Sequence, residues 1–330
     1  MNNKMKAVVY EKYGAPEVLH MVEVEKPVPK ENEVLIKIYS TTVSAADWRA
    51  RSLIIPYGFK HISHLVFGVS KPRQPILGME LAGEVESIGK GVTKYKAGDK
   101  VFAATGITMG CYAQYKCMPE DGAVALKPDN LSFDEAAALT FGGITALHFF
   151  RKAKLQPGEK VLINGASGAV GTAALQLARH FGADITAICS GPNTELVKSL
   201  GANHVIDYTK EDFTKNGETY DVIMDNVGTA PFSRSKNSLT KQGRFLLILG
   251  TLLNLLQIPI VSLTSSKKIF GGSASTSVED LQFLAELAEN GEFRPFIDRR
   301  YPLEEIVEAH RYVDTGRKRG NVIITVKKEK

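Results

Sequence analysis

The segment 160–171 (KVLINGASGAVG) constrains the fold more than any other part of the chain. A short apolar run typical of a buried strand leads into glycines at 165, 168 and 171, and an apolar helical pattern follows. A pyrophosphate can approach the backbone N–H groups of such a turn, where the helix dipole favours negative charge. The last glycine lets the helix lie close to the strand. The pattern predicts a dinucleotide site formed by Gly165, Ala166, Ser167, Gly168, Ala169, Val170 and Gly171.

Strand and helix patterns alternate after this turn. The runs ITAICS, HVIDY, YDVIMDNVG, GRFLLILG and KKIFGGS read as strands, and GTAALQLARHFG and TELVKSLG read as helices. Apolar strands that alternate with helices are typical of an α/β domain with a doubly wound parallel sheet. This part of the chain is therefore predicted to be a Rossmann-type cofactor domain.

The first 125 residues or so have a different texture. Short β-branched runs separated by Gly, Pro and Asn predict an antiparallel, barrel-like β domain. Ser132 with Glu135 three residues later forms a capping box that begins a helix. Helix and strand patterns near the C-terminus are expected to complete the β domain. The predicted domains are 1–127 with 274–330, and 128–273 for the cofactor domain.

The end of the second strand of the cofactor domain favours NADPH over NADH. A carboxylate that binds the ribose of NADH is expected there, but the loop reads Cys-Ser-Gly-Pro-Asn over 189–193. Asp184 has the right distance from the glycines but opens the strand, at the edge far from the cofactor. Without an acid in the loop, Ser190 and Asn193 can donate hydrogen bonds to a 2′-phosphate.

Composition narrows the class of protein and its setting. The net charge of +5 is mild and no basic patch is interleaved with aromatics, so no nucleic-acid partner is expected. Three cysteines without paired spacing, and a start without an apolar signal segment, favour the cytoplasm. The run 245–266 carries no charge, but Gly250 and Pro259 argue against a transmembrane helix. An internal interface and peripheral membrane contact are both open for this run.

Several motifs together resemble one family. The chain from about residue 6 to 326 contains YGAPEVL, EVLIKI, VSAADWRAR, PILGMELAGEVESIG, GDKVFA, FGGITAL, NGASGAVGTAALQLAR and HRYVDTGRKRGNVIITV. With these motifs it resembles the medium-chain dehydrogenase/reductase superfamily, and within it the zinc-free quinone oxidoreductase branch, which includes zeta-crystallin. The resemblance implies a GroES-like catalytic domain beside the cofactor domain.

The resemblance also implies that the protein binds no catalytic zinc. Zinc alcohol dehydrogenases of this superfamily hold the metal with Cys, a His-Glu pair and a second Cys. The matching positions here are Ser44, Met79 with Glu80, and Phe141. A hydroxyl, a thioether and a phenyl ring do not hold zinc at neutral pH. Without a Lewis acid, hydride transfer suits acceptors that are already electrophilic.

The family's site residues carry over position by position. Ser44 and Asp47 match residues that line the nicotinamide pocket, although Asp47 could instead only hold its loop, and Thr145 matches a threonine that contacts nicotinamide. Further cofactor positions follow the sheet strands: Tyr208, Asn226, Gly228, Leu249, Gly250, Phe270 and Gly271. Asn321 stands where the family often has Lys, which weakens its assignment to the cofactor site.

Two features of the catalytic domain stay open. The proton could come from Tyr57 or from water, because the tyrosines that the family often has in the stretch 49–55 are missing. The apolar insert 52–74 could be a substrate lid or a packed loop. His61 and His64 in this insert are two ligands without a third, which is more typical of structural or surface histidines.

The sequence therefore predicts an NADPH-dependent, zinc-independent reductase of quinones or α,β-unsaturated carbonyls. Two alternatives are an NAD(P)-dependent alcohol or aldehyde dehydrogenase, and a non-catalytic NADPH-binding redox sensor or membrane-associated partner. The family resemblance implies a homodimer joined through the last strands of the cofactor sheets.

Overall fold

The computed structural model describes residues 3–328, and the chain divides into two compact units. Unit 1 takes in the chain up to Ile55, His61–Phe141 and the chain from Thr276 onward. Unit 2 takes in Pro56–Lys60 and Gly142–Ser275. Each unit has its own sheets and its own apolar core, and each is described by itself below.

Unit 2 is built on a six-stranded parallel sheet. The strand order is β10-β9-β8-β11-β12-β13, so the chain begins in the middle, moves outward to one edge and then returns to fill the other half. This is the doubly wound order of a Rossmann-type domain, and it confirms the predicted fold class. The strands are β8 (Lys160–Asn164), β9 (Asp184–Cys189), β10 (His204–Asp207), β11 (Tyr220–Asp225), β12 (Leu239–Leu247) and β13 (Lys268–Gly271).

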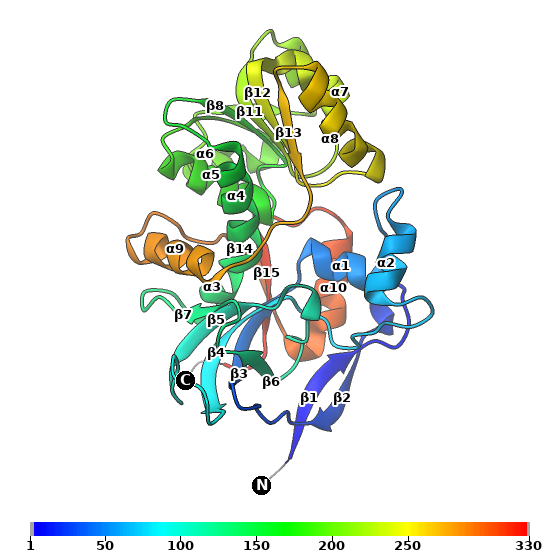
Figure 1. Ribbon diagram of the computed structural model, residues 1–330, viewed down its shortest axis with the longest axis vertical. Coiled ribbons are helices and arrows are strands. Elements are labelled where there is room, and N and C mark those ends of the chain that lie inside the picture. The colour runs from blue at the N-terminus through cyan, green and yellow to red at the C-terminus, as the bar shows by residue number, and fades with distance from the viewer. Residues whose placement is uncertain (1–2, 329–330) are drawn as a thin grey trace. The chain divides into compact units, whose positions relative to one another are not determined.

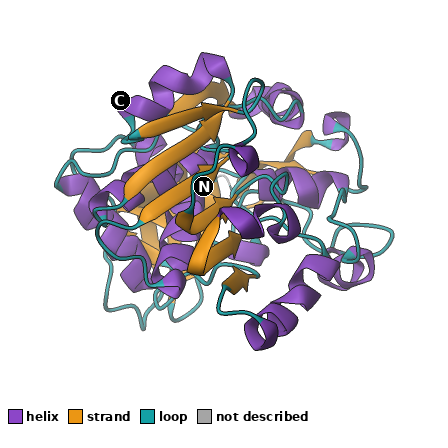
Figure 2. Ribbon diagram, turned by 90° about the horizontal axis from the view of Figure 1, so that it is seen from above, coloured by secondary structure: helices purple, strands orange, loops and turns teal. Residues whose placement is uncertain are grey.

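Helices lie on both sides of this sheet (Figure 1), and Figure 2 shows the helices and strands of the chain from above. The helices are α4 (Thr140–Ala153), α5 (Ala169–His180), α6 (Thr194–Ser199), α7 (Phe232–Ser235) and α8 (Leu252–Thr264). Helix α5 ends at His180, Phe181 is its C-cap residue, and Gly182 follows with φ of +73°, which is the left-handed conformation common after a helix.

Unit 1 contains a seven-stranded, mostly antiparallel sheet and a separate hairpin of β1 (Lys4–Val9) and β2 (His20–Glu25). The order of the main sheet is β14-β15-β3-β4-β5-β7, and β6 also pairs with β3. In the part of this sheet that the structure describes, the β14–β15 pair alone is parallel. The strands are β3 (Glu33–Thr42), β4 (Glu80–Ile88), β5 (Lys100–Ala104), β6 (Tyr115–Pro119), β7 (Val124–Leu126), β14 (Ile297–Pro302) and β15 (Asn321–Thr325).

The helices of unit 1 include one that the sequence assigned to the cofactor domain. Helix α3 (Phe133–Ala138) begins at the predicted capping box, in which Ser132 and Glu135 bond to each other's backbone N–H groups. It packs against β3 and β4, so unit 1 extends to Phe141 rather than ending at residue 127. The other helices are α1 (Ala45–Ser52), α2 (Lys60–Phe67), α9 (Val278–Glu289) and α10 (Ile306–Asp314).

The uncharged run 245–266 has two parts. FLLIL, as predicted, lies mostly in a buried strand, the end of β12, whereas the following residues form helix α8, which the sequence analysis did not foresee. Thr251 caps this helix by accepting a hydrogen bond from the Asn254 backbone, and Pro259 lies inside it. Within residues 3–328 no helix is long and apolar enough to cross a membrane.

Candidate functional site

The glycine-rich turn lies between β8 and α5, at the carboxyl edge of the parallel sheet. Gly165 has φ of +75°, and Gly168 is the N-cap residue of α5. A Cβ atom on Gly171 would lie 2.2 Å from the carbonyl oxygen of Gly165, whereas one on Gly168 would meet nothing closer than 3.7 Å. Gly171 is thus required for close packing inside the turn, while Gly168 leaves open space at the helix N-terminus, where a pyrophosphate would bind.

The carboxylate of Asp225 fixes the neighbouring loop. Strands β8 and β11 are adjacent although the chain leaves them in opposite directions, which is the point where α/β sheets bind ligands. Asp225 is fully buried and accepts hydrogen bonds from Asn164 Nδ2 (2.9 Å) and from the backbone N–H groups of Gly228 (3.0 Å) and Ala230 (3.1 Å). The sequence analysis missed this residue, although an acid that ends a buried strand before a glycine is a usable signal.

Asn226 gives the clearest indication of a ligand at this edge. Both polar atoms of its side-chain amide, Nδ2 and Oδ1, are buried and have no hydrogen-bond partner. Buried amide atoms are usually paired, so an unpaired donor and acceptor next to the turn fit the hydroxyls of a ribose. The residues of the turn and of this loop therefore fit a nicotinamide dinucleotide.

Most of the predicted cofactor residues share this edge, because the carboxyl ends of parallel strands lie together. Ser190 and Asn193 follow β9, Tyr208 follows β10, and Leu249 and Gly250 follow β12. Gly228 lies in the loop after β11, and Phe270 and Gly271 end β13. Asn193 Nδ2 donates to both Ser167 Oγ and Ser190 Oγ, at 3.2 Å each, and so joins the glycine-rich turn to the loop after β9.

The structure brings a carboxylate from the neighbouring strand next to the loop after β9. Asp207 ends β10, which pairs with β9, and its carboxylate accepts hydrogen bonds from the Thr209 backbone (3.0 Å) and hydroxyl (2.7 Å). Its Oδ2 atom lies close to Gly191, and Lys210 Nζ is 3.9 Å away. These hydrogen bonds, led by that of Thr209, lower the pKa of Asp207. The sequence analysis searched only the β9 loop itself and did not find this carboxylate.

In unit 1, Ser44 and Asp47 form a buried capping box at the start of α1. Ser44 donates to Asp47 Oδ2 from its backbone N (2.9 Å) and its hydroxyl (2.6 Å), and Gly78 N donates to Oδ1 (3.0 Å). Burial raises the pKa of Asp47 to about 6, against the opposing effect of these hydrogen bonds. Asp47 thus holds its own loop, one of the two roles predicted for it.

A second buried carboxylate, Glu80, lies at the start of β4. Its oxygens accept hydrogen bonds from the hydroxyls of Thr42 and Thr140 and from the backbone N of Phe141 (2.7 Å). Burial raises the pKa of Glu80 to about 7, so this group changes charge close to neutral pH. Of the four residues at the family's zinc positions, Ser44 thus belongs to the hydrogen-bonded group of Asp47 and Gly78, and Glu80 is bonded to the Phe141 backbone. Met79 lies between Gly78 and Glu80 in the chain.

The donor chemistry of this region does not suit a metal. Ser44 donates its hydroxyl proton to Asp47, and Met79 and Phe141 offer no nitrogen, thiolate or carboxylate. Among residues 3–328, no three His, Cys, Asp or Glu side chains are grouped so that they could hold a metal ion. His61 and His64 lie in α2, and no third such ligand joins them.

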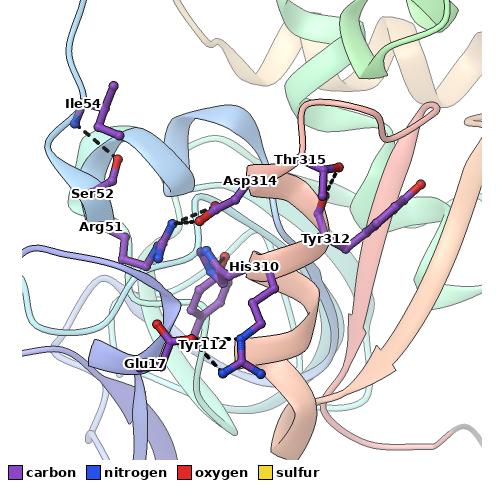
Figure 3. A network of polar contacts seen from close by, with 10 residues as sticks. Glu17, Arg51, Ser52, Ile54, Tyr112, His310, Tyr312, Asp314 and Thr315 are labelled. Carbon is purple, nitrogen blue, oxygen red and sulfur yellow. Dashed lines mark hydrogen bonds and ion pairs between the residues drawn. The ribbon is translucent and has the colours of Figure 1, made fainter.

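An ion pair fastens α1, which carries Asp47, to α10 (Figure 3). The Arg51 guanidinium is completely buried, and its Nη2 donates to both oxygens of Asp314, at 2.7 and 2.6 Å. Arg51 Nε and Nη1 have no hydrogen-bond partner. Beside them lies His310, whose Nε2 is 3.2 Å from the Tyr112 hydroxyl, and burial lowers its pKa to about 3.

The remaining three predicted residues lie in different parts of the chain. Tyr57 belongs to unit 2, where its carbonyl accepts from Leu252 N (3.0 Å), and its side chain is largely exposed. Thr145 is half-buried in α4. Asn321 begins β15 in unit 1 and donates to the Phe296 carbonyl (3.1 Å).

Comparison with known families and proteins agrees with this geometry. A family model described as alcohol dehydrogenase GroES-like domain matches residues 30–129, and one described as zinc-binding dehydrogenase matches residues 200–324. The chain is 33% identical to 2-methylene-furan-3-one reductase of Solanum lycopersicum, over 98% of this chain and 79% of that protein. It is 31% identical to the chloroplast envelope quinone oxidoreductase homolog of Arabidopsis thaliana, over 97% and 98%.

A solved structure of a quinone oxidoreductase has the same fold. The quinone oxidoreductase from Coxiella burnetii superimposes with a TM-score of 0.87 at 30% identity, covering 98% of this chain and all of that one. The chain belongs to the medium-chain dehydrogenase/reductase superfamily, in its quinone oxidoreductase branch, and is an oxidoreductase of the quinone and enone reductase type that uses a nicotinamide cofactor.

Proposed function

We propose that this protein transfers a hydride from NADPH to quinones or to the double bond of α,β-unsaturated carbonyl compounds, without a metal. The observation that carries the proposal is the glycine-rich turn, which is open at Gly168 and lies beside the unpaired amide of Asn226. The relatives named above are called quinone and furanone reductases, which supports the substrate class.

The cofactor supplies the hydride, and the protein's residues bind and orient it. Preorganised N–H groups at the start of α5 favour the pyrophosphate. Asp225 keeps the loop after β11 in place, so that Asn226 is held for the ribose. Addition of a hydride leaves a hydroquinone or enolate anion, and a proton from Tyr57 or from water completes the reduction. Water is the simpler source, because Tyr57 is exposed.

The metal-free part of the proposal rests on donor chemistry. The zinc positions of the superfamily carry Ser44, Met79 and Phe141, and the remaining carboxylate, Glu80, already accepts three hydrogen bonds. Electrophilic acceptors do not need a Lewis acid, whereas simple ketones do. The same reasoning ranks the alcohol or aldehyde dehydrogenase alternative below the reductase.

The first test follows NADPH absorbance with 9,10-phenanthrenequinone, 1,4-benzoquinone, a 2-alkenal and a simple ketone, after dialysis against EDTA. We expect turnover of the quinones or of the alkenal, and none of the ketone. Activity that disappears on dialysis and returns with zinc would contradict the metal-free proposal. Turnover of the ketone alone would favour the dehydrogenase alternative.

Preference for NADPH is proposed from the loop after β9. Ser190 and Asn193 can donate hydrogen bonds to a 2′-phosphate, and Lys210 adds a positive charge that Asp207 partly offsets. A Ser190→Asp variant is expected to lower the ratio of kcat/KM for NADPH to that for NADH by about tenfold or more, because a carboxylate repels the phosphate and accepts from a ribose hydroxyl. Ser199→Asp, an exposed change in α6, is the matched control. An unchanged ratio in both variants would place the phosphate elsewhere.

We also propose a cytoplasmic homodimer. All three cysteines are unpaired, in keeping with a reducing compartment. Among residues 3–328, strand β13 pairs only with β12, so one side of its backbone is available to a second copy. Light scattering after size-exclusion chromatography distinguishes a dimer from a 36.0 kDa monomer.

A further inference from the structure

Three Asn-Gly pairs occur in the chain, and two of them belong to the same tripeptide. Asn216 and Asn290 are each followed by Gly and Glu. The third pair, Asn164 with Gly165, begins the glycine-rich turn. In such a pair the backbone N of the glycine can attack the side-chain carbonyl carbon of the asparagine, because glycine has no side chain to obstruct the approach. Since the three pairs share this local chemistry, the fold decides which of them reacts.

The two Asn-Gly-Glu tripeptides have nearly the same backbone conformation. Asn216 follows the 3-10 turn η4 (Phe213–Lys215) with φ of −82° and ψ of −2°, and Asn290 follows α9 with φ of −76° and ψ of −5°. Gly217 and Gly291 have φ of +79° and +74°. Both glycines are exposed, and Asn290 is exposed whereas Asn216 is half-buried. Backbone shape and exposure alone therefore do not favour a reaction at Asn216.

Hydrogen bonds hold the tripeptide at the end of α9. The Gly291 N–H donates to the Ala288 carbonyl (3.1 Å), and the Glu292 N–H donates to the Leu287 carbonyl (2.8 Å). These bonds satisfy carbonyl groups of the last helical turn. The backbone N of Gly291 cannot attack a neighbouring carbonyl without breaking them, so the end of the helix protects Asn290.

The loop at Asn216 is bonded in a different way. Among residues 3–328, the Gly217 N–H has no acceptor. The Glu218 N–H donates to the side-chain oxygen of Asn216, Oδ1, at 3.0 Å. A donor at this oxygen polarises the carbonyl and stabilises the negative charge that develops on the oxygen when Cγ is attacked. The attacking nitrogen is thus free, and the carbonyl that it attacks is already polarised.

The pair in the glycine-rich turn is protected by its side chain. Asn164 is buried, and its Nδ2 donates to Asp225 Oδ1 (2.9 Å) and to Thr229 Oγ1 (3.0 Å). Nδ2 is the atom that must leave, so both hydrogen bonds have to break before the amide is lost. Of the three pairs, the fold therefore leaves the one at Asn216 open to reaction.

Asn216 also lines a cavity at the amino edge of the parallel sheet. The cavity has a volume of about 290 Å³. Its lining includes the first residues of four neighbouring strands, which are Lys160, Asp184, His204 and Tyr220. A polar cavity of this size has room for water. Water can thus reach Asn216, and a small molecule released there can leave.

We propose that Asn216 is a site of spontaneous deamidation. Gly217 N forms a bond to Asn216 Cγ, the Cγ–Nδ2 bond breaks, and the departing NH2 group takes up the Gly217 proton and leaves as ammonia. Water then opens the cyclic imide at either of its two carbonyls, which leaves aspartate or isoaspartate at position 216. The reaction needs no oxidant, reductant or enzyme. The inference does not depend on the proposed hydride transfer.

The new carboxylate would lie far from the cofactor residues. Strand β11, about 17 Å long, separates this loop from Asp225 and Asn226 at the other edge of the sheet. Beside Asn216, the Glu218 carboxylate pairs with Lys160 Nζ at 3.3 Å, so a further carboxylate makes the cavity more acidic. Deamidation is therefore expected to lower the net charge by one and to leave NADPH binding unchanged.

Peptide mass spectrometry of the folded full chain tests the proposal. The protein is incubated at mildly alkaline pH and physiological temperature, and fragmentation distinguishes asparagine, aspartate and isoaspartate at each of the three positions. We expect loss of the amide at Asn216 to be at least about tenfold faster than at Asn290, because two hydrogen bonds hold the second tripeptide. Asn164 should keep its amide. In urea the two tripeptides should react at similar rates, because their sequences are the same.

Two matched variants identify the product. Ion-exchange chromatography of incubated protein should show an acidic species, which Asn216→Gln removes and Asn290→Gln leaves in place. Circular dichroism establishes that both variants are folded. Equal rates at the two tripeptides of the folded protein, or a faster loss at Asn290, would overturn the proposal. An amide that stays intact at Asn216 would overturn it as well.

Discussion

Replacing Asp314 by Ala should destabilise the protein more than replacing Arg51 by Met, although both changes remove the same ion pair. The two partners differ in burial: the Arg51 side chain is 0% exposed and the Asp314 side chain is 28% exposed. Without Asp314, the guanidinium is buried with no counter-charge, and its Nε and Nη1 already lack partners. Without Arg51, the carboxylate can still be hydrated, and Met fills much of the volume that the arginine chain occupied.

The difference can be put in numbers. Removing one partner of a buried pair and leaving the other charged costs about 3–5 kcal/mol. Removing the buried charge itself costs only its hydrogen bonds, about 1–2 kcal/mol. For a unit the size of unit 1 these values correspond to a fall in Tm of about 6–20 °C for Asp314→Ala and about 2–8 °C for Arg51→Met.

Thermal and urea unfolding, followed by circular dichroism, measure both variants and the double variant. In the Arg51→Met background, Asp314→Ala should lower the free energy of unfolding by almost nothing more, because no buried guanidinium is left that could lose its counter-charge. Equal losses in the two single variants, or a larger loss for Arg51→Met, would refute the reasoning that the unpaired guanidinium sets the cost.

Two further predictions concern the turn and Glu80. Gly168→Val should keep the fold and weaken NADPH binding by about 100-fold in a fluorescence titration. Gly171→Ala should instead lower Tm or solubility, because its Cβ would overlap the Gly165 carbonyl oxygen. Normal NADPH binding by a folded Gly168→Val variant would contradict the proposed site. Burial raises the Glu80 pKa to about 7, above its unfolded value, so its share of stability is present at low pH and lost as pH rises through 7. The free energy of unfolding of Glu80→Gln, measured with urea, should therefore rise relative to that of the unchanged protein by on the order of 3 kcal/mol between pH 5 and pH 8. A difference between the two proteins that does not change with pH would contradict the prediction.

Local patterns explain why much of unit 2 could be predicted from the sequence. The apolar strand, the glycines and the helix of the turn are contiguous, and each signal depends only on neighbouring residues. The same holds for the capping box at Ser132. Parallel strands then bring their carboxyl ends together, so that placing a strand also places the residue that follows it.

The rest depends on contacts between residues far apart in the chain. Arg51 and Asp314 are 263 positions apart, and neither carries a local signal of its partner. Asp207 reaches the loop after β9 only because β10 pairs with β9. Helix α8 was missed because Gly250 and Pro259 favour a turn, whereas the capping box of Thr251 and packing of Leu255 on the core outweigh them.

The position of β15 has a consequence for the order in which the chain acquires its structure during synthesis. Strand β15, at the C-terminal end, lies between β14 and β3 in the sheet of unit 1. The ribosome therefore completes all six strands of unit 2 before it makes either β14 or β15. Until then β3 lacks its neighbour β15, and Arg51 lacks its ion-pair partner Asp314. A nascent chain arrested before residue 297 would carry a complete cofactor sheet beside an open strand edge, the kind of edge that chaperones must shield from other chains.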